Sequence, residues 1–112
     1  MTIETDLYSA VTGDSGVNAL IGTRMYPVVA PGGVTKPFIT YFVITRTIMG
    51  GTCYRGRIQM TITDTSYSGV KGVRDALQTL VESTSNYVWL EGTDAYQDNE
   101  GLYHQSVDVQ IT

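Results

Sequence analysis

The order of hydrophobic and polar positions predicts two short helices at the start of the chain. Residues 3–12 carry one apolar stripe with helical spacing, and Gly13 ends it. A second helix begins at a cap formed by Asp14 or Ser15 and closes at Gly22. The inward stripes of the two helices consist of Ile3, Leu7, Ala10, Val11, Val17, Leu20 and Ile21.

The next part of the chain changes from a proline-rich segment to strand periodicity. Residues 26–37 contain three prolines and a Gly-Gly pair, so they are expected to cross the surface in extended or turn conformations. Residues 38–48 are apolar on both faces, which predicts a central strand or a strand with one face against a partner subunit. After a hairpin turn at Gly50-Gly51, residues 57–63 alternate and predict a half-exposed antiparallel strand.

The C-terminal half predicts a longer helix followed by two strands. Asp64, Thr65 or Ser66 caps a helix that runs from about 66 to 83, with the stripe Val70, Val73, Leu77, Leu80 and Val81. Gly69 and Gly72 lower its helix propensity and would permit close packing on the sheet. A short strand over 87–91, a polar acidic loop over 92–101 and an alternating strand over about 102–111 complete the pattern.

This order of elements predicts an α+β fold, with a mostly antiparallel β-sheet and two main α-helices packed on one face. The 112 residues predict a single domain over 1–112, large enough to bury one core. No apolar run is long enough to span a membrane, and Met1–Asp6 does not resemble a signal peptide. Cys53 is the only cysteine, so no intramolecular disulfide is expected.

Charge and composition favour protein contacts over nucleic-acid binding. The net charge of −4 argues against neutralising phosphates, because nucleic-acid-binding domains are usually basic. The chain has eight tyrosines but two phenylalanines and one tryptophan. Tyrosine is common in interfaces because its ring packs while its hydroxyl keeps a hydrogen bond, although it also caps sheet edges.

Three patterns suggest chemistry, and each has a simpler structural explanation. Residues 13–16, Gly-Asp-Ser-Gly, match the nucleophile tetrapeptide of trypsin-like proteases, but a helix cap explains them. Cys53 and His104 could form a dyad, yet no third orienting group is evident. The acidic loop lacks the spacing of a calcium loop. We therefore expect no catalytic residue, no cofactor and no metal site.

Charged residues concentrate in the hairpin after residue 45 and in the acidic loop. A charged hairpin can simply discourage aggregation at a sheet edge. Alternatively, the basic hairpin of one copy forms salt bridges with the acidic loop of a second copy, which is a heterologous contact. The candidate interface residues are Arg46, Tyr54, Arg55, Arg57, Asp94, Asp98 and Glu100.

A set of weak motifs in a fixed order resembles the tail terminator, or tail completion, family of tailed phages. The family pattern includes a helix, an R-x-Y-P…P-[FY]-I-x-Y segment and a closing strand. The hairpin Met49–Thr52 departs from the pattern, since this part varies in length and sequence. The segments that carry the resemblance are Ile3–Tyr8, Ala19–Gly22, Thr23–Pro27, Ala30-Pro31, Lys36–Tyr41, Tyr54–Thr61, Ser66–Leu80 and Tyr103–Val109.

The resemblance implies a structural virion protein without enzymatic activity. Such subunits form a ring, usually hexameric, that caps the tail tube, stops its polymerisation and joins the head connector. The implied partners are further copies of the chain, the tail tube protein and the head–tail connector protein. DNA passes through the channel without specific binding, no membrane is involved, and assembly takes place in the bacterial host cytoplasm. A net acidic subunit suits passage of DNA better than a grip on it.

Two alternatives stay open at this stage. A head-completion or neck protein of the same virion has the same size and class, and binding to portal complexes instead of tail tubes would distinguish it. A small enzyme or ligand-binding α+β domain would instead need a polar pocket with convergent titratable groups. A single histidine and a single cysteine argue against that second alternative.

Overall fold

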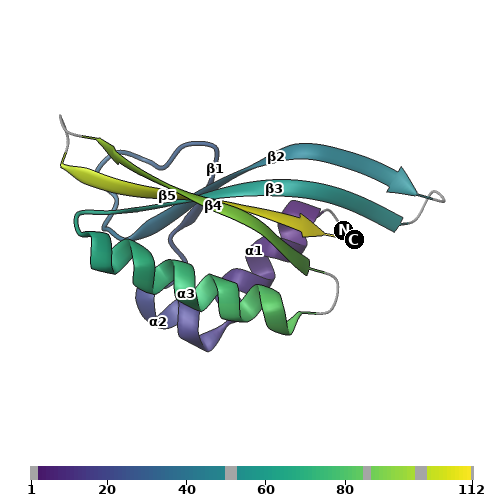
Figure 1. Ribbon diagram of the computed structural model, residues 1–112, viewed down its shortest axis with the longest axis horizontal. Coiled ribbons are helices and arrows are strands. Elements are labelled where there is room, and N and C mark those ends of the chain that lie inside the picture. The colour runs from purple at the N-terminus through teal and green to yellow at the C-terminus, as the bar shows by residue number, and fades with distance from the viewer. Residues whose placement is uncertain (1–2, 50–52, 85–86, 98–100, 112) are drawn as a thin grey trace.

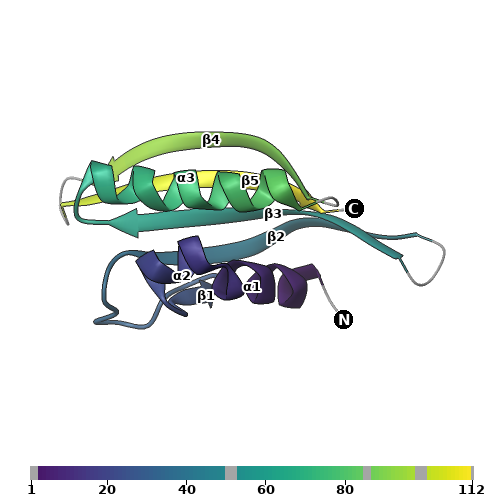
Figure 2. The same cartoon turned by 90° about the horizontal axis from the view of Figure 1, so that it is seen from below.

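The computed structural model describes residues 3–49, 53–84, 87–97 and 101–111. Within them, five strands form one sheet in the order β1-β2-β3-β5-β4. All three helices lie on the same face of this sheet and leave the opposite face uncovered (Figures 1 and 2). Along the chain the elements are α1 (Ile3–Gly13), α2 (Ser15–Ile21), β1 (Met25–Pro27), β2 (Phe38–Met49), β3 (Cys53–Asp64), α3 (Tyr67–Ser83), β4 (Tyr87–Gln97) and β5 (Leu102–Ile111).

The sheet is antiparallel except for the short parallel pair of β1 with β2. It therefore confirms the predicted α+β class with a mostly antiparallel sheet and helices on one face. Figure 2 shows α3 lying along β3 and β5, while α1 and α2 lie toward β1 and β2. The ends of β2 and β3 that lead to their connecting hairpin extend past the helices in both views.

The core lies between the helices and the inward-facing side chains of the sheet. The inward residues of α3 are buried as its apolar stripe predicts, apart from the partly buried Leu80. The predicted inward stripe of α2 is wrong for Leu20. Its side chain is 41% exposed, while its neighbours Val17 and Ile21 are buried. The fully buried side chains are Leu7, Val11, Val17, Ile21, Ile39, Ile58, Met60, Ile62, Val70, Val73, Leu77 and Val81.

The helix starts follow the predicted capping chemistry. Asp14 is the N-cap of α2, where its carboxylate accepts a hydrogen bond from the Val17 N–H at 3.0 Å. Ser66 is the N-cap of α3, where its hydroxyl accepts from the Gly69 N–H at 3.1 Å. At Gly69 a Cβ would collide with the Asp64 side chain beside the cap, so the close contact there is with the helix start and not with the face of the sheet. A Cβ at Gly72 would meet nothing within 4 Å, so the prediction of close packing is wrong for Gly72.

The predicted acidic loop is the main error in the sequence-based fold. Most of it is strand, because β4 runs to Gln97 and pairs with β5 over its whole length. The polar half of β4 has weak strand propensity, but its pairing with β5 overrides that preference. Gly101, with φ of 65°, lies in the short connection that follows. The proline-rich segment likewise contributes a strand, β1, which Pro27 ends.

Candidate assembly interface

The predicted basic residues lie along the hairpin formed by β2 and β3. In the antiparallel register Arg46 lies opposite Gly56, Arg55 opposite Thr47, and Tyr54 opposite Ile48. Arg57 follows opposite Thr45, beside a β-bulge between Val43 and Thr45. The fold thus brings Arg46, Tyr54, Arg55 and Arg57 together at one end of the sheet.

Arg57 forms an ion pair within its own chain. Its Nη2 donates to Asp108 Oδ2, and the two side chains are 40% and 12% exposed. The pair joins the two central strands, β3 and β5, on the face without helices. A carboxylate this buried needs a charged partner, so the pair fixes Asp108 in the middle of that face.

The predicted acidic residues lie elsewhere. Asp94 belongs to β4 and pairs with Gln105 of β5, whereas Arg57 pairs with Gln110 of the same strand. These two positions on β5 are separated by roughly 17 Å at ~3.4 Å per residue. Asp98 and Glu100 lie outside the described residues. Within one chain, the fold therefore does not bring the basic hairpin and Asp94 together.

The uncovered face of the sheet has a polar centre. Alternation along β3 and β5 points Gln59, Thr61, Ser106 and Gln110 away from the core. A hydrogen bond of 2.9 Å joins Thr63 Oγ1 to His104 Nδ1 in the same layer. Together with the Arg57–Asp108 ion pair, these groups make the outer face of β3 and β5 polar, and two of them, Thr63 and Asp108, are buried.

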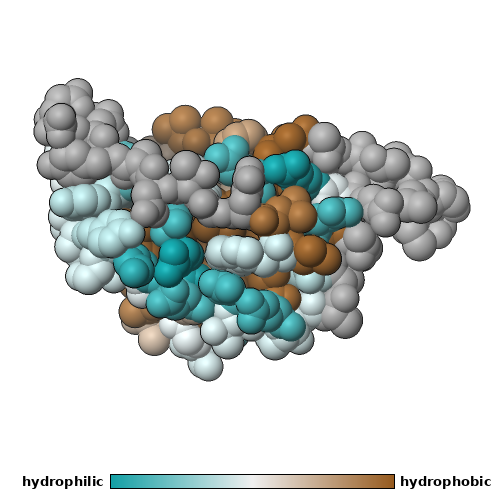
Figure 3. Space-filling view, in the orientation of Figure 1, coloured by the Kyte–Doolittle hydropathy of each residue, from teal (hydrophilic) through white to brown (hydrophobic). Residues whose placement is uncertain are grey.

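The outer strands carry hydrophobic side chains on that same face. Phe42 and Ile44 of β2 are 43% and 42% exposed, and Val88 and Leu90 of β4 are 48% and 38% exposed. Figure 3 shows hydrophobic surface along the upper edge of the molecule, on the side of the sheet away from the helices. Sequence reasoning did not select these four residues. For Phe42 and Ile44 the signal was a strand that is apolar on both faces, for which one predicted explanation was burial against a partner subunit. Val88 and Leu90 had no such signal.

A shallow groove of about 310 Å³ lies beside the hydrophobic part of β2. Its lining is mostly apolar, and Val28 and Val29 next to it are 68% and 73% exposed. Val28 has a φ of 62°, which is unusual for a β-branched residue, and turns the chain away from β2. The groove is lined by Pro27, Val28, Tyr41, Phe42 and Val43.

The structure places the candidate catalytic residues at a helix cap and on two strands. The Asp14 carboxylate is used as a helix cap, which accounts for the Gly-Asp-Ser-Gly sequence. His104 lies opposite Thr63, at the end of β3 remote from Cys53. The ten residue steps from Cys53 to Thr63 span roughly 33 Å of strand. A Cys53–His104 dyad within one chain is therefore impossible.

Among the described residues, no three histidine, cysteine, aspartate or glutamate side chains form a group that could hold a metal ion. In the same part of the chain, no helix has the length and hydrophobicity needed to cross a membrane.

Comparisons with known proteins agree with this description. A solved chain from the structure titled "Virion of native gene transfer agent (GTA) particle" has the same fold, with a TM-score of 0.74 and 13% sequence identity. The match covers 97% of this chain and 92% of the other. No curated protein matches the sequence significantly. The family model described as "Tail completion protein gp17" matches residues 5–112, so the chain belongs to the tail completion protein family.

Proposed function

We propose that this protein caps a phage tail tube as an oligomeric ring, ends tube polymerisation and forms the joint to the head connector. Membership of the tail completion family over residues 5–112 carries the proposal and makes the chain a structural protein of a phage tail. The proposed partners are further copies of the chain, six in a ring as the family resemblance implies, together with the tail tube protein and the connector protein. Assembly takes place in the bacterial host cytoplasm.

The surface of the molecule supports an assembly role. A small sheet with helices on one face leaves its other face to solvent, and hydrophobic residues flank that face on both sides. Exposed hydrophobic patches with a polar surround are typical of protein interaction sites. The net charge of −4 suits a channel through which DNA moves without being held.

The basic hairpin is the second part of the proposal. Arg46, Tyr54 and Arg55 lie on the part of β2 and β3 that extends past the helices. We expect these residues to contact acidic residues of a neighbouring subunit, with Asp94, Asp98 and Glu100 as candidates. Arg57 already pairs with Asp108, so its part in assembly would be to order the base of the hairpin.

The direct experiment is to mix the purified protein with tubes assembled from the tail tube protein of the same phage. Negative-stain images should show a ring-shaped density at tube ends, and tubes grown in its presence should be shorter. A variant in which residues 46–55 are replaced by a short turn should remain folded but leave the tube ends bare. Binding to portal complexes but not to tubes would contradict the proposal and indicate a neck protein.

A further inference from the structure

In the described part of the chain, both edges of the sheet leave a long stretch of strand paired on one side only. β1 covers β2 only from Ile39 to Tyr41, so among the described residues β2 from Phe42 to Met49 pairs with β3 alone. At the other edge β4 pairs only with β5 in the described part of the chain. Both edges are long, whereas proteins usually shorten or cover edge strands to prevent uncontrolled pairing. The lengths of these two edges suggest that each one has a partner.

Backbone groups of β2 beyond Tyr41 point toward the open edge, where they could hydrogen-bond to another strand. Ile39 N–H donates to the Arg24 carbonyl at 3.0 Å, and the Tyr41 carbonyl accepts from the Val28 N–H at 2.8 Å. Polar groups of alternate residues in a strand point to the same edge, so the N–H and C=O of Val43 face the side that β1 has left. The apolar groove described above lies at this point.

The strand directions and the registers of the two edges match. β2, β3, β5 and β4 are successive antiparallel neighbours, so β2 and β4 run in opposite directions. Following the registers across the sheet, Val88 lies level with Gln110, Arg57 and Thr45. The exposed pair Val88 and Leu90 therefore lies at the same height as Phe42 and Ile44, on the same face.

The edges also have complementary charge. The strand β2 has one charged residue, the basic Arg46, whereas β4 has Glu91 and Asp94 and no basic residue. The opposite signs of the two strands favour pairing of β2 with β4 over pairing of two β4 strands, which would bring four carboxylates into one contact.

We propose that β4 of one copy adds to the edge of β2, residues 42–49, of the next copy as an antiparallel strand. The inference rests on the proposed ring, for which it specifies the contact between subunits. Main-chain hydrogen bonds would supply affinity, and the added apolar side chains would cover Phe42, Ile44 and the groove, as in β-strand addition. Because each copy uses two different edges, the contact is heterologous and can be repeated around a ring.

The test is a pair of engineered cysteines on opposite edges. In a Cys53→Ser background, Ile44→Cys is combined with Val88→Cys or, as a second register, Leu90→Cys. Opposed residues of an antiparallel pair have Cβ atoms about 4.5–5.5 Å apart, close to what a disulfide needs. Oxidised glutathione is added to the protein alone and on tube ends. The proposal predicts a ladder of covalent multimers on a non-reducing gel.

The single variants provide the matched controls. Either one alone should give no covalent multimer, and a mixture of the two should give covalent dimers without a ladder. Efficient dimer formation by one single variant would overturn the proposal, because it would indicate pairing of identical edges. Ile44→Lys should also abolish assembly, while Ser9→Lys, the same charge at an exposed position of α1, should not. Equal assembly of the two lysine variants would overturn the proposal as well.

The results for the ring and for its contact can be told apart. If the wild-type protein caps tubes but neither double-cysteine variant gives a ladder, the edge contact is wrong and the cap stands. If a ladder forms but tube ends stay bare in every image, the contact stands and the proposed function is wrong. A protein that neither caps tubes nor forms covalent multimers would contradict both.

Discussion

The two faces of the sheet use the same strands for different purposes. On β3 and β5 the inward residues Ile58, Met60, Ile62, Val107 and Val109 are fully buried under the helices. Their sequence neighbours on the outer face are polar, and hydrophobic residues return only near the edges. Period-two alternation therefore separates the residues that hold the monomer together from those available to a neighbour. The difference predicts that substitutions on the two faces will affect different properties.

The largest contrast should come from truncating one hydrophobic side chain on each face. Leu77 of α3 is fully buried, so Leu77→Ala should lower the free energy of unfolding by about 2–5 kcal/mol. Phe42 on the outer face is 43% exposed, so Phe42→Ala should cost the monomer about 1 kcal/mol or less. Urea unfolding measures both, and sedimentation with tubes should show loss of binding for Phe42→Ala. Similar stability losses for the two variants would contradict the distinction.

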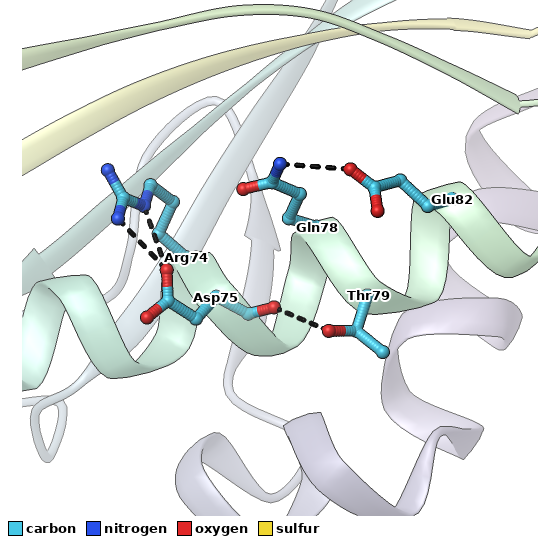
Figure 4. A network of polar contacts seen from close by, with 5 residues as sticks. All are labelled: Arg74, Asp75, Gln78, Thr79 and Glu82. Atoms are coloured by element: carbon cyan, nitrogen blue, oxygen red, sulfur yellow. Dashed lines mark hydrogen bonds and ion pairs between the residues drawn. The ribbon is translucent and has the colours of Figure 1, made fainter.

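A smaller contrast involves two ion pairs. Asp108→Asn removes the partner of Arg57 at a site where the carboxylate is 12% exposed, and should cost about 1–2 kcal/mol. The control is Asp75→Asn, whose pair with Arg74 lies on the solvent side of α3 at 2.9 Å (Figure 4). Exposed pairs contribute about 0–1 kcal/mol, so this change should be nearly neutral. Equal losses in urea unfolding would show that the central pair is no more important than a surface pair.

Two glycines of α3 offer a matched test of close packing. Gly72→Ala should raise the free energy of unfolding by about 0.5–1 kcal/mol, because alanine favours a helix and nothing lies near its Cβ. Gly69→Ala should lower it by about 1 kcal/mol, since the methyl group would displace Asp64 and disturb the Ser66 cap. Thermal unfolding of both variants gives the answer. A stabilising Gly69→Ala would show that Asp64 moves aside without cost.

The smallest expected effect is a change in stability at alkaline pH, which comes from Tyr87. Burial raises the pKa of Tyr87 above its usual value of 10.0, and the charge of Asp6 adds to this shift. The folded protein therefore holds the phenol proton more tightly than the unfolded chain. Its contribution to stability is complete below pH 10 and is lost as the pH rises through the folded pKa. Tyr87→Phe should reduce the loss of stability as the pH rises above 10, measured by urea unfolding against wild type.

The parts of the fold that depend on local signals could be predicted from the sequence. The three helices follow from their apolar stripes, and the caps at Asp14 and Ser66 follow from capping chemistry. The alternation of residues 57–63 correctly predicted which side chains of β3 face the core. Leu20 was misplaced because α2 is only seven residues long and its stripe is narrow.

The parts that depend on contacts distant in sequence could not be predicted. The second half of β4 has no alternation of its own and exists because β5 pairs with it. Strand order is equally non-local, since β5 inserts between β3 and β4. Arg57 and Asp108 are 51 residues apart, and no local pattern indicates their pairing. The strand order decides which strands form the edges of the sheet, so the proposed subunit contact could not be predicted without it.

The most direct test of the distinction between the covered face and the assembling edges is amide hydrogen exchange, measured for the free protein and for the protein on tube ends. Peptides that cover Phe42–Met49 and Tyr87–Gln97 should gain protection on assembly, because their edge amides acquire partners. Peptides from α3 should not change. Unchanged exchange at both edges, with new protection on the helices, would show that subunits meet through the covered side and would contradict the account.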